Sequence, residues 1–81
     1  MDKAMDAAIG SELRTIRDEQ HITQLALAER LHVAQRFISH TESGKRSLRL
    51  AEIMGYAVAL NMNPLTVYAR VKQVLVDKGF I

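Results

Sequence analysis

The sequence predicts an all-α fold, a bundle of five short helices. Apolar residues recur every three or four positions through most of the 81-residue chain, which is the spacing of a helix with one buried side. Apolar residues make up 48% of the composition and aromatic residues only 5%, which favours packed helices over a sheet. Glycine, asparagine and the single proline separate the periodic segments, as residues that end or start helices should.

The size of the chain predicts one domain over residues 1–81, with a core at about 9–71 and a C-terminal helix extension at about 72–81. The absence of cysteine excludes disulfides and thiolate metal sites and fits a reducing cytoplasm. No apolar run is long enough to span a bilayer, and the acidic start is unlike a secretory signal. We therefore expect a cytoplasmic protein, and its small core favours association with a second copy.

The first two helices are expected at about residues 3–20 and 24–31. Thr23 is a suitable N-cap for the second, because its hydroxyl can accept a backbone hydrogen bond. His32 stands where the chain must turn, at a position that often takes the left-handed conformation. The residues expected to be buried are Met5, Ile9, Leu13 and Ile16, followed by Leu27, Ala28 and Leu31.

The third helix is expected at about residues 34–43, followed by Gly44 as its terminator. Ile38 and Thr41 should point inward. The opposite side of this helix is polar and carries Gln35, Arg36, Ser39 and His40.

The last two helices are expected at about residues 50–60, ended by Asn61, and 64–78, started by the Asn63-Pro64 pair. In the fourth helix, the inward residues should be Leu50, Ile53, Met54, Ala57 and Leu60. In the fifth, Leu65 and Tyr68 can return to the core. A second apolar line would be exposed in a small bundle, so we expect a two-fold interface there rather than monomer core; it consists of Val67, Val71, Val74 and Leu75.

The charge distribution is more informative than the formal net charge of +2. Between His21 and Arg49 the chain has five cations against two acids, so the positive surplus lies over the segment made of the second and third helices and the loop that follows them. A local surplus of this kind is typical of a surface that meets phosphates. The cations are Arg30, Arg36, Lys45, Arg46 and Arg49.

In the order and spacing of several short segments, the chain resembles the helix-turn-helix domain of phage repressors and Cro, the XRE type. The resemblance covers about residues 9–71. The segments that carry it are Leu13-Arg14-Thr15-Ile16-Arg17, Ile22-Thr23-Gln24, Leu27-Ala28-Glu29-Arg30-Leu31, Ile38-Ser39, Glu42-Ser43-Gly44-Lys45-Arg46, Ala57-Val58-Ala59-Leu60 and Asn63-Pro64-Leu65. The chain departs from the family pattern at His32, where glycine is usual, at Thr41, and at Leu25 and Ala26.

The resemblance implies roles for individual residues. Gln24 would touch a phosphate, and the turn with Ser43, Lys45 and Arg46 would form a second backbone clamp. An ion pair between Arg17 and Glu42 would join the first and third helices. The residues implied to face base edges are Gln35, Arg36, Ser39 and His40. Arginine can pair with guanine and glutamine with adenine through two hydrogen bonds each.

The function implied is that of a sequence-specific DNA-binding regulator of transcription. Helix 34–43 would enter the major groove, and a homodimer would bind an inverted-repeat operator. Repression is the commoner outcome in the resembling family. The alternatives are an antitoxin of a toxin–antitoxin pair, a controller protein of a restriction–modification system, and a helical interaction module without DNA binding. Double-stranded DNA and a second copy are thus the expected partners, with a toxin or RNA polymerase as further candidates.

No combination of residues suggests catalysis. The serines lack a histidine–acid pair and there is no glycine-rich phosphate loop, so we expect neither enzymatic activity nor a cofactor. His21, His32 and His40 lie on different elements at spacings that match no common zinc pattern. We therefore expect no metal site.

Overall fold

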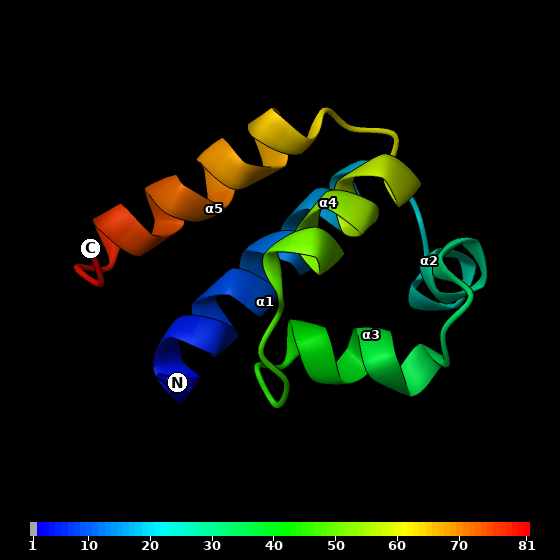
Figure 1. Ribbon diagram of the computed structural model, residues 1–81, viewed down its shortest axis with the longest axis horizontal. Coiled ribbons are helices and arrows are strands. Elements are labelled where there is room, and N and C mark those ends of the chain that lie inside the picture. The colour runs from blue at the N-terminus through cyan, green and yellow to red at the C-terminus, as the bar shows by residue number, and fades with distance from the viewer. Residues whose placement is uncertain (1) are drawn as a thin grey trace.

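The computed structural model describes residues 2–81, which form five helices and no strand (Figure 1). The helices are α1 (Lys3–Glu19), α2 (Gln24–Leu31), α3 (Gln35–Glu42), α4 (Leu50–Ala59) and α5 (Pro64–Asp77). The predicted all-α, five-helix fold is confirmed, and each predicted helix end lies within one residue of the observed one. None of these helices has the length and apolar character that a membrane crossing requires.

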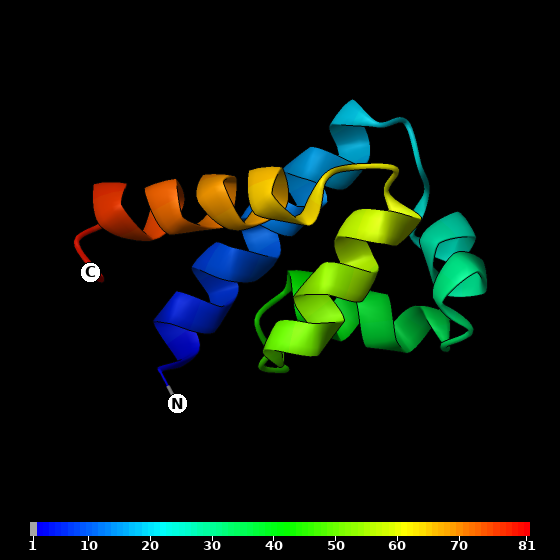
Figure 2. The same cartoon turned by 45° about the horizontal axis from the view of Figure 1, so that its top comes forward.

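Helix α1 is the central element. It contacts α5 along one side and α3 on another, while α2 contacts both α3 and α4, and α4 contacts α5 (Figures 1 and 2). The N-terminal end of α1 and the C-terminal end of α5 lie on the same side of the molecule, away from α2 (Figure 2). Helix α3 is therefore supported by α1 and α2 and remains open on its outer side.

All five helices contribute to one core. The largest side chains that are completely or almost completely buried are Leu13, Ile16, Leu27, Ile38, Thr41, Tyr56, Leu60 and Val67. Tyr56 was not expected among them. Burial raises the pKa of its phenol to about 12, so the ring enters the core uncharged.

Local capping chemistry fixes the helix ends at the predicted residues. The Thr23 hydroxyl accepts a hydrogen bond from the Ala26 N–H at 3.0 Å and starts α2. His32 and Asn61 both take the left-handed conformation, with φ of 56° and 59°. Gly44, with φ of 79°, ends the turn after α3. These predictions are confirmed.

The orientation of α4 differs from the prediction. Leu50 and Met54 were expected in the core, but 62% and 48% of their surfaces are exposed. Ala57 and Leu60 are buried as predicted, and Tyr56, which was not predicted to point inward, is buried with them. Because α4 carries apolar residues on more than one side, its periodicity did not decide which side would be buried.

Helix α5 is also rotated relative to the prediction. Leu65 and Tyr68 were expected in the core, but 75% and 54% of their surfaces are exposed. The line predicted to form a two-fold interface is instead part of the monomer core: Val67, Val71 and Leu75 are buried and Val74 packs against them. The predicted dimer interface is therefore wrong.

Ion pairs between α5 and α1 accompany this orientation of α5. Arg70 Nε donates to Glu12 Oε2 at 3.0 Å, and Arg70 Nη2 donates to Glu19 Oε2 at 2.9 Å. Arg70 directly precedes Val71, which is buried while Arg70 pairs with α1. The opposite side of α5 is then left facing solvent.

Candidate nucleic-acid interface

The connection between α2 and α3 is a tight turn. His32 reverses the chain in the left-handed conformation, and the Val33 N–H donates to the Ala28 carbonyl at 3.0 Å. Helix α3 begins two residues later, after Ala34. Ile38, in the middle of α3, is completely buried, and this fixes which side of the helix faces out.

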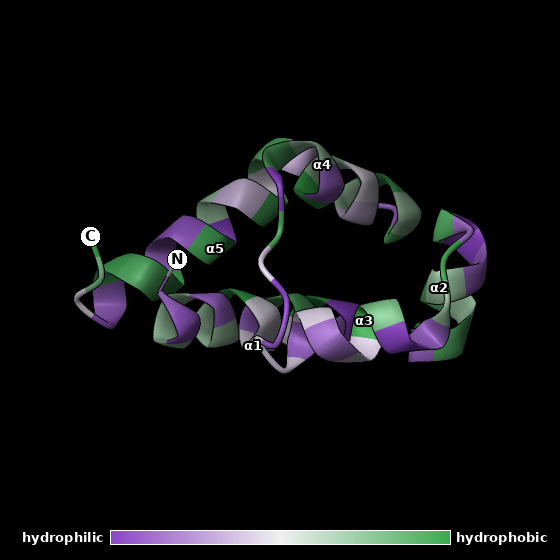
Figure 3. Ribbon diagram, turned by 60° about the horizontal axis from the view of Figure 1, so that its bottom comes forward, coloured by the Kyte–Doolittle hydropathy of each residue, from purple (hydrophilic) through white to green (hydrophobic). Residues whose placement is uncertain are grey.

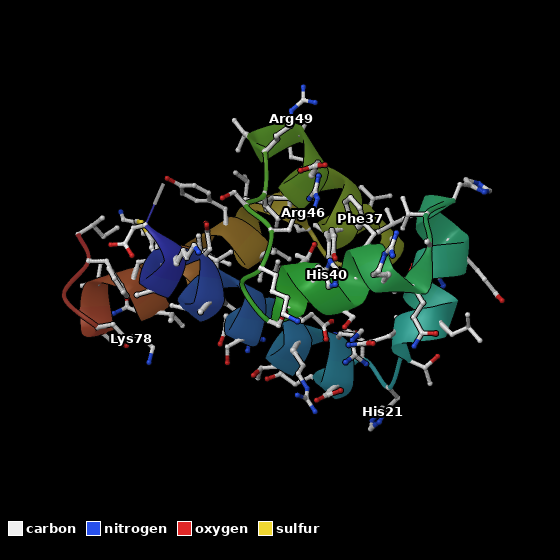
Figure 4. All side chains as sticks on the ribbon, turned by 90° about the horizontal axis from the view of Figure 1, so that it is seen from below. His21, Phe37, His40, Arg46, Arg49 and Lys78 are labelled. Atoms are coloured by element: carbon white, nitrogen blue, oxygen red, sulfur yellow. The ribbon has the colours of Figure 1, made fainter. Side chains whose placement is uncertain are left out.

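The outer side of α3 carries the four side chains predicted to face base edges. Gln35 and Arg36 are exposed, and Ser39 and His40 are partly exposed. None of the four forms a side-chain hydrogen bond or ion pair with another residue among 2–81. Figure 4 looks onto this side of α3, and Figure 3 shows its predominantly hydrophilic colouring. The structure thus brings these side chains together on an accessible surface.

The loop that follows α3 also carries polar side chains, among them Ser43 and Lys45. Ser43 caps its C-terminal end and donates to the His40 carbonyl at 3.3 Å. Lys45 is exposed and has no ion-pair partner in the part of the chain that the structure describes. A cleft of about 620 Å³ separates this loop from the start of α1, and Lys3 lines it together with Ser43 and Lys45.

Lys3 is a candidate phosphate contact that the sequence did not reveal. It lies 42 positions before Lys45 in the chain, and only the packing of α1 on the loop brings the two lysines to one cleft. That packing depends on Gly44, where an added Cβ would lie 2.5 Å from the Ala7 Cα. No sequence pattern signals such a close approach.

The five cations counted over the motif divide into two groups. Arg36, Lys45 and Arg49 are exposed and form no ion pair with any described residue. Arg30 donates to the Ala59 carbonyl at 2.8 Å and so completes the end of α4. Arg46 forms an ion pair with Glu52, which was not expected for a residue predicted to contact a phosphate.

Both ends of the Arg46 fork bind one carboxylate. Its Nη1 lies 3.1 Å from Glu52 Oε1 and its Nη2 lies 2.6 Å from Glu52 Oε2. These hydrogen bonds hold the pKa of Glu52 below its usual value, so the pair is ionised at neutral pH. Arg46 therefore links the loop after α3 to the first turn of α4.

The ion pair implied between α1 and α3 is present. Arg17 Nε donates to Glu42 Oε2 at 2.7 Å, and Arg17 Nη2 donates to Glu42 Oε1 at 3.0 Å. The hydrogen bonds that Arg17 donates to Glu42 raise the pKa of Arg17, although burial alone would lower it. Gln24 Nε2 donates to Glu42 as well, at 2.9 Å, and its contact with a phosphate stays a prediction. This network joins the end of α1, the start of α2 and the end of α3.

No group of three or more histidine, cysteine or acidic side chains that could hold a metal ion occurs within residues 2–81. The three histidines lie apart, and only His40 belongs to the outer side of α3.

A family model described as helix-turn-helix matches residues 13–67, which is most of the chain. The chain belongs to the helix-turn-helix family of the XRE type. The resemblance inferred from short segments is thereby confirmed. Membership in this family makes the chain a DNA-binding regulator of transcription, and such regulators are typically not enzymes.

Three solved structures resemble the chain over most of its length. The clp gene regulator ClgR from C. glutamicum is 23% identical, with 85% of this chain and 90% of that chain covered and a TM-score of 0.78. The restriction–modification controller protein C.AhdI from Aeromonas hydrophila is 26% identical, with 79% and 97% covered and a TM-score of 0.72.

A mutant of the restriction–modification controller protein C.Esp1396I is 20% identical, with 94% and 96% covered and a TM-score of 0.82. No curated protein matches the chain by sequence. The likenesses below 25% identity show the shared fold, and the family match shows the shared type of function.

Proposed function

We propose that the chain represses transcription as a homodimer on an inverted-repeat operator, with α3 of each copy in the major groove. The observation that carries this proposal is the outer side of α3, where four polar side chains form no hydrogen bond or ion pair with any other residue among 2–81. The eight residues of α3 make a rod about 12 Å long, and a helix of ordinary width fits the major groove of B-DNA. Occupation of a promoter by such a dimer would exclude RNA polymerase.

Arg36 and Lys45 should contribute to binding in different ways. Arg36→Ala is expected to weaken binding to the preferred operator by roughly 1–3 kcal/mol and to relax specificity at one or two base pairs, because arginine reads guanine through two hydrogen bonds.

Lys45→Ala should weaken binding to all sequences alike, because it removes one phosphate contact. The slope of log K against log salt concentration should become less steep by about one unit.

The measurement is a selection of bound sequences from random DNA, followed by titration of operator and random duplexes at several salt concentrations. The symmetry of the selected sequence also reports whether two copies bind. Equal losses on operator and random DNA for Arg36→Ala would remove this residue from base recognition. A wild-type protein whose affinity for random DNA does not change with salt would point to the alternative without DNA binding.

An apolar groove between α4 and α5 is the surface that we assign to the second copy. It measures about 220 Å³ and is lined by Leu50, Ile53, Met54, Pro64, Leu65 and Tyr68. None of these side chains is charged. Exposed apolar residues gathered in one place favour a protein interface. A second copy fits because the proposed operator is symmetric, and an isologous interface puts the same groove on both sides.

Leu65→Glu should convert the dimer into a monomer, with a loss in dimer affinity of roughly a hundredfold or more, because two carboxylates would enter one apolar interface. The substitution suits the fold, since an acid near the start of a helix is favourable. Leu25→Glu is the matched control: Leu25 is also exposed, and each leucine is the second residue of its helix. Analytical ultracentrifugation should show a monomer for the first variant only. A dimer in both would exclude this groove.

The controller protein of a restriction–modification system is the second candidate function. Two of the three similar structures described above are such controllers. Under this alternative, the sequence selected from random DNA should lie before restriction or modification genes. The antitoxin alternative requires a toxin partner, which copurification from the native host would reveal. A contact with RNA polymerase would turn repression into activation.

A further inference from the structure

We infer that Arg46 is a positioning residue that holds the recognition helix α3 to helix α4, and that it does not bind the DNA backbone. The inference rests on the DNA-binding function and assigns a role within the same site. It replaces the phosphate contact that the position of Arg46, directly after Lys45, had suggested.

On one side, Arg46 is fixed by Glu52. The two parallel hydrogen bonds between the guanidinium and the carboxylate fix its plane as well as its position. Glu52 is itself held, because its Oε1 accepts the Arg49 N–H at 2.9 Å in the first turn of α4. Side-chain exposure is only 31% for Arg46 and 23% for Glu52, so solvent screens this pair less than a surface pair.

On its other side, Arg46 contacts α3. Its Cζ lies 4.0 Å from the centre of the Phe37 ring, which is the arrangement of a cation–π interaction. Figure 4 shows the two side chains close together between α3 and α4, whereas Arg49 points away from the protein. Phe37 stands between Arg36, predicted to read bases, and Ile38, which is buried. A shift of α3 at Phe37 would therefore move Arg36 as well.

The link matters because the backbones of α3 and α4 do not approach each other closely. Within residues 2–81, α3 packs against α1 and α2, and α4 packs against α2 and α5. The chain of contacts Phe37–Arg46–Glu52 spans this gap. It joins α3 to α4, and α4 also lines the groove assigned to the second copy.

The same contacts argue against a phosphate-binding role. The charge of Arg46 is compensated by Glu52, so the pair together releases few counterions when a phosphate approaches. The neighbouring Lys45 is exposed and free of ion pairs with described residues, and it is better placed for that task. One loop thus provides a DNA contact and, directly after it, an internal clamp.

Three variants separate these roles: Arg46→Met, Glu52→Gln and, as the matched control, Lys45→Met. Arg46→Met and Glu52→Gln, called the clamp variants below, each break the link between α3 and α4. Both should reduce the preference for the operator over random DNA on the order of tenfold, because the two residues belong to one contact network. Their salt dependence should match that of the wild type. Lys45→Met should instead keep the preference and flatten the salt dependence by about one unit.

The outcome for Glu52→Gln is decisive. If Arg46 bound a phosphate, freeing it from Glu52 and removing an acid would tighten binding to all DNA, and Arg46→Met would flatten the salt dependence as the Lys45 variant does. Either result would overturn the inference. Arg46→Lys keeps the charge but loses the fork, and should restore only part of the preference.

A measurement without DNA separates this inference from the proposed function. In the free protein, both clamp variants should speed hydrogen exchange of the α3 amides and leave those of α5 unchanged. Unchanged exchange in α3 would overturn the clamp even if the wild type binds its operator. Conversely, a wild type without operator preference would refute the proposed function, and the exchange data would still decide on the clamp.

Discussion

Replacing Arg17 by methionine is expected to lower the free energy of unfolding by about 3–5 kcal/mol, because it leaves a buried carboxylate without its cation. Only 8% of the Arg17 side chain and 3% of the Glu42 side chain are exposed. The Ile22 carbonyl, which accepts from Arg17 Nη1 at 2.8 Å, would lose its donor as well. The total free energy of unfolding of a small domain is roughly 5–15 kcal/mol, so much of the native stability would be lost. Urea denaturation monitored by circular dichroism measures the change.

Arg14→Met is the control, since Arg14 lies on the same helix and pairs with Asp18 at the surface. The two groups are 3.8 Å apart, and 67% and 59% of their side chains are exposed. We expect a change of about 0.5 kcal/mol or less. Combining Arg17→Met with Glu42→Leu should recover most of the loss, because an apolar pair needs no cation. If Arg17→Met and Arg14→Met lowered the free energy of unfolding equally, burial would not determine how much the Arg17–Glu42 pair contributes to stability.

The helix ends could be predicted from sequence because their causes are local. Thr23 reaches an N–H three residues away, and Asn63 accepts from the Leu65 N–H at 2.8 Å. Left-handed residues such as His32 and Asn61 likewise act on their own turn. The Arg17–Glu42 pair spans 25 positions, and only the resemblance to a family suggested it.

The rotation of α5 could not be predicted, because two apolar lines on one helix satisfy the same periodicity. The choice between them depends on packing against α1, including the contacts of Arg70 with Glu12 and Glu19 more than 50 positions earlier. The wrong dimer interface is a direct consequence of this ambiguity. Once Val67 and Val71 are buried, Leu65 becomes part of the exposed groove.

The candidate site was predictable to the extent that exposure follows from helix periodicity. Gln35 and Arg36 are exposed as expected, since Ile38 and Thr41 fix the inner side of α3. The partner of a charged side chain does not follow from periodicity. The sequence around Arg46 is that of a phosphate contact, and only the contacts of Arg46 with Glu52 and Phe37 in the folded protein distinguish the two roles.

Gly10→Ala is expected to destabilise the protein by about 3 kcal/mol, the upper end of the usual range for added volume in a packed core. An added Cβ would lie 2.2 Å from the Thr41 carbonyl oxygen and 2.7 Å from that of Glu42. Both atoms belong to the backbone of α3, so no side chain can move aside. Helix α1 must shift away from α3, and this shift would also strain the bidentate contact between Arg17 and Glu42.

Gly55→Ala makes the same change at a site that has room for it, because the new Cβ would lie 3.8 Å from Leu31 Cδ2. Here the helix preference of alanine should prevail and stabilise the protein by up to about 1 kcal/mol. Thermal unfolding of the two variants should therefore shift in opposite directions. Since alanine also favours α1 at Gly10, a gain in stability there would mean that α1 and α3 do not approach as closely as the structure has them. A loss at Gly10 alone would show that the position requires glycine for space rather than for backbone freedom.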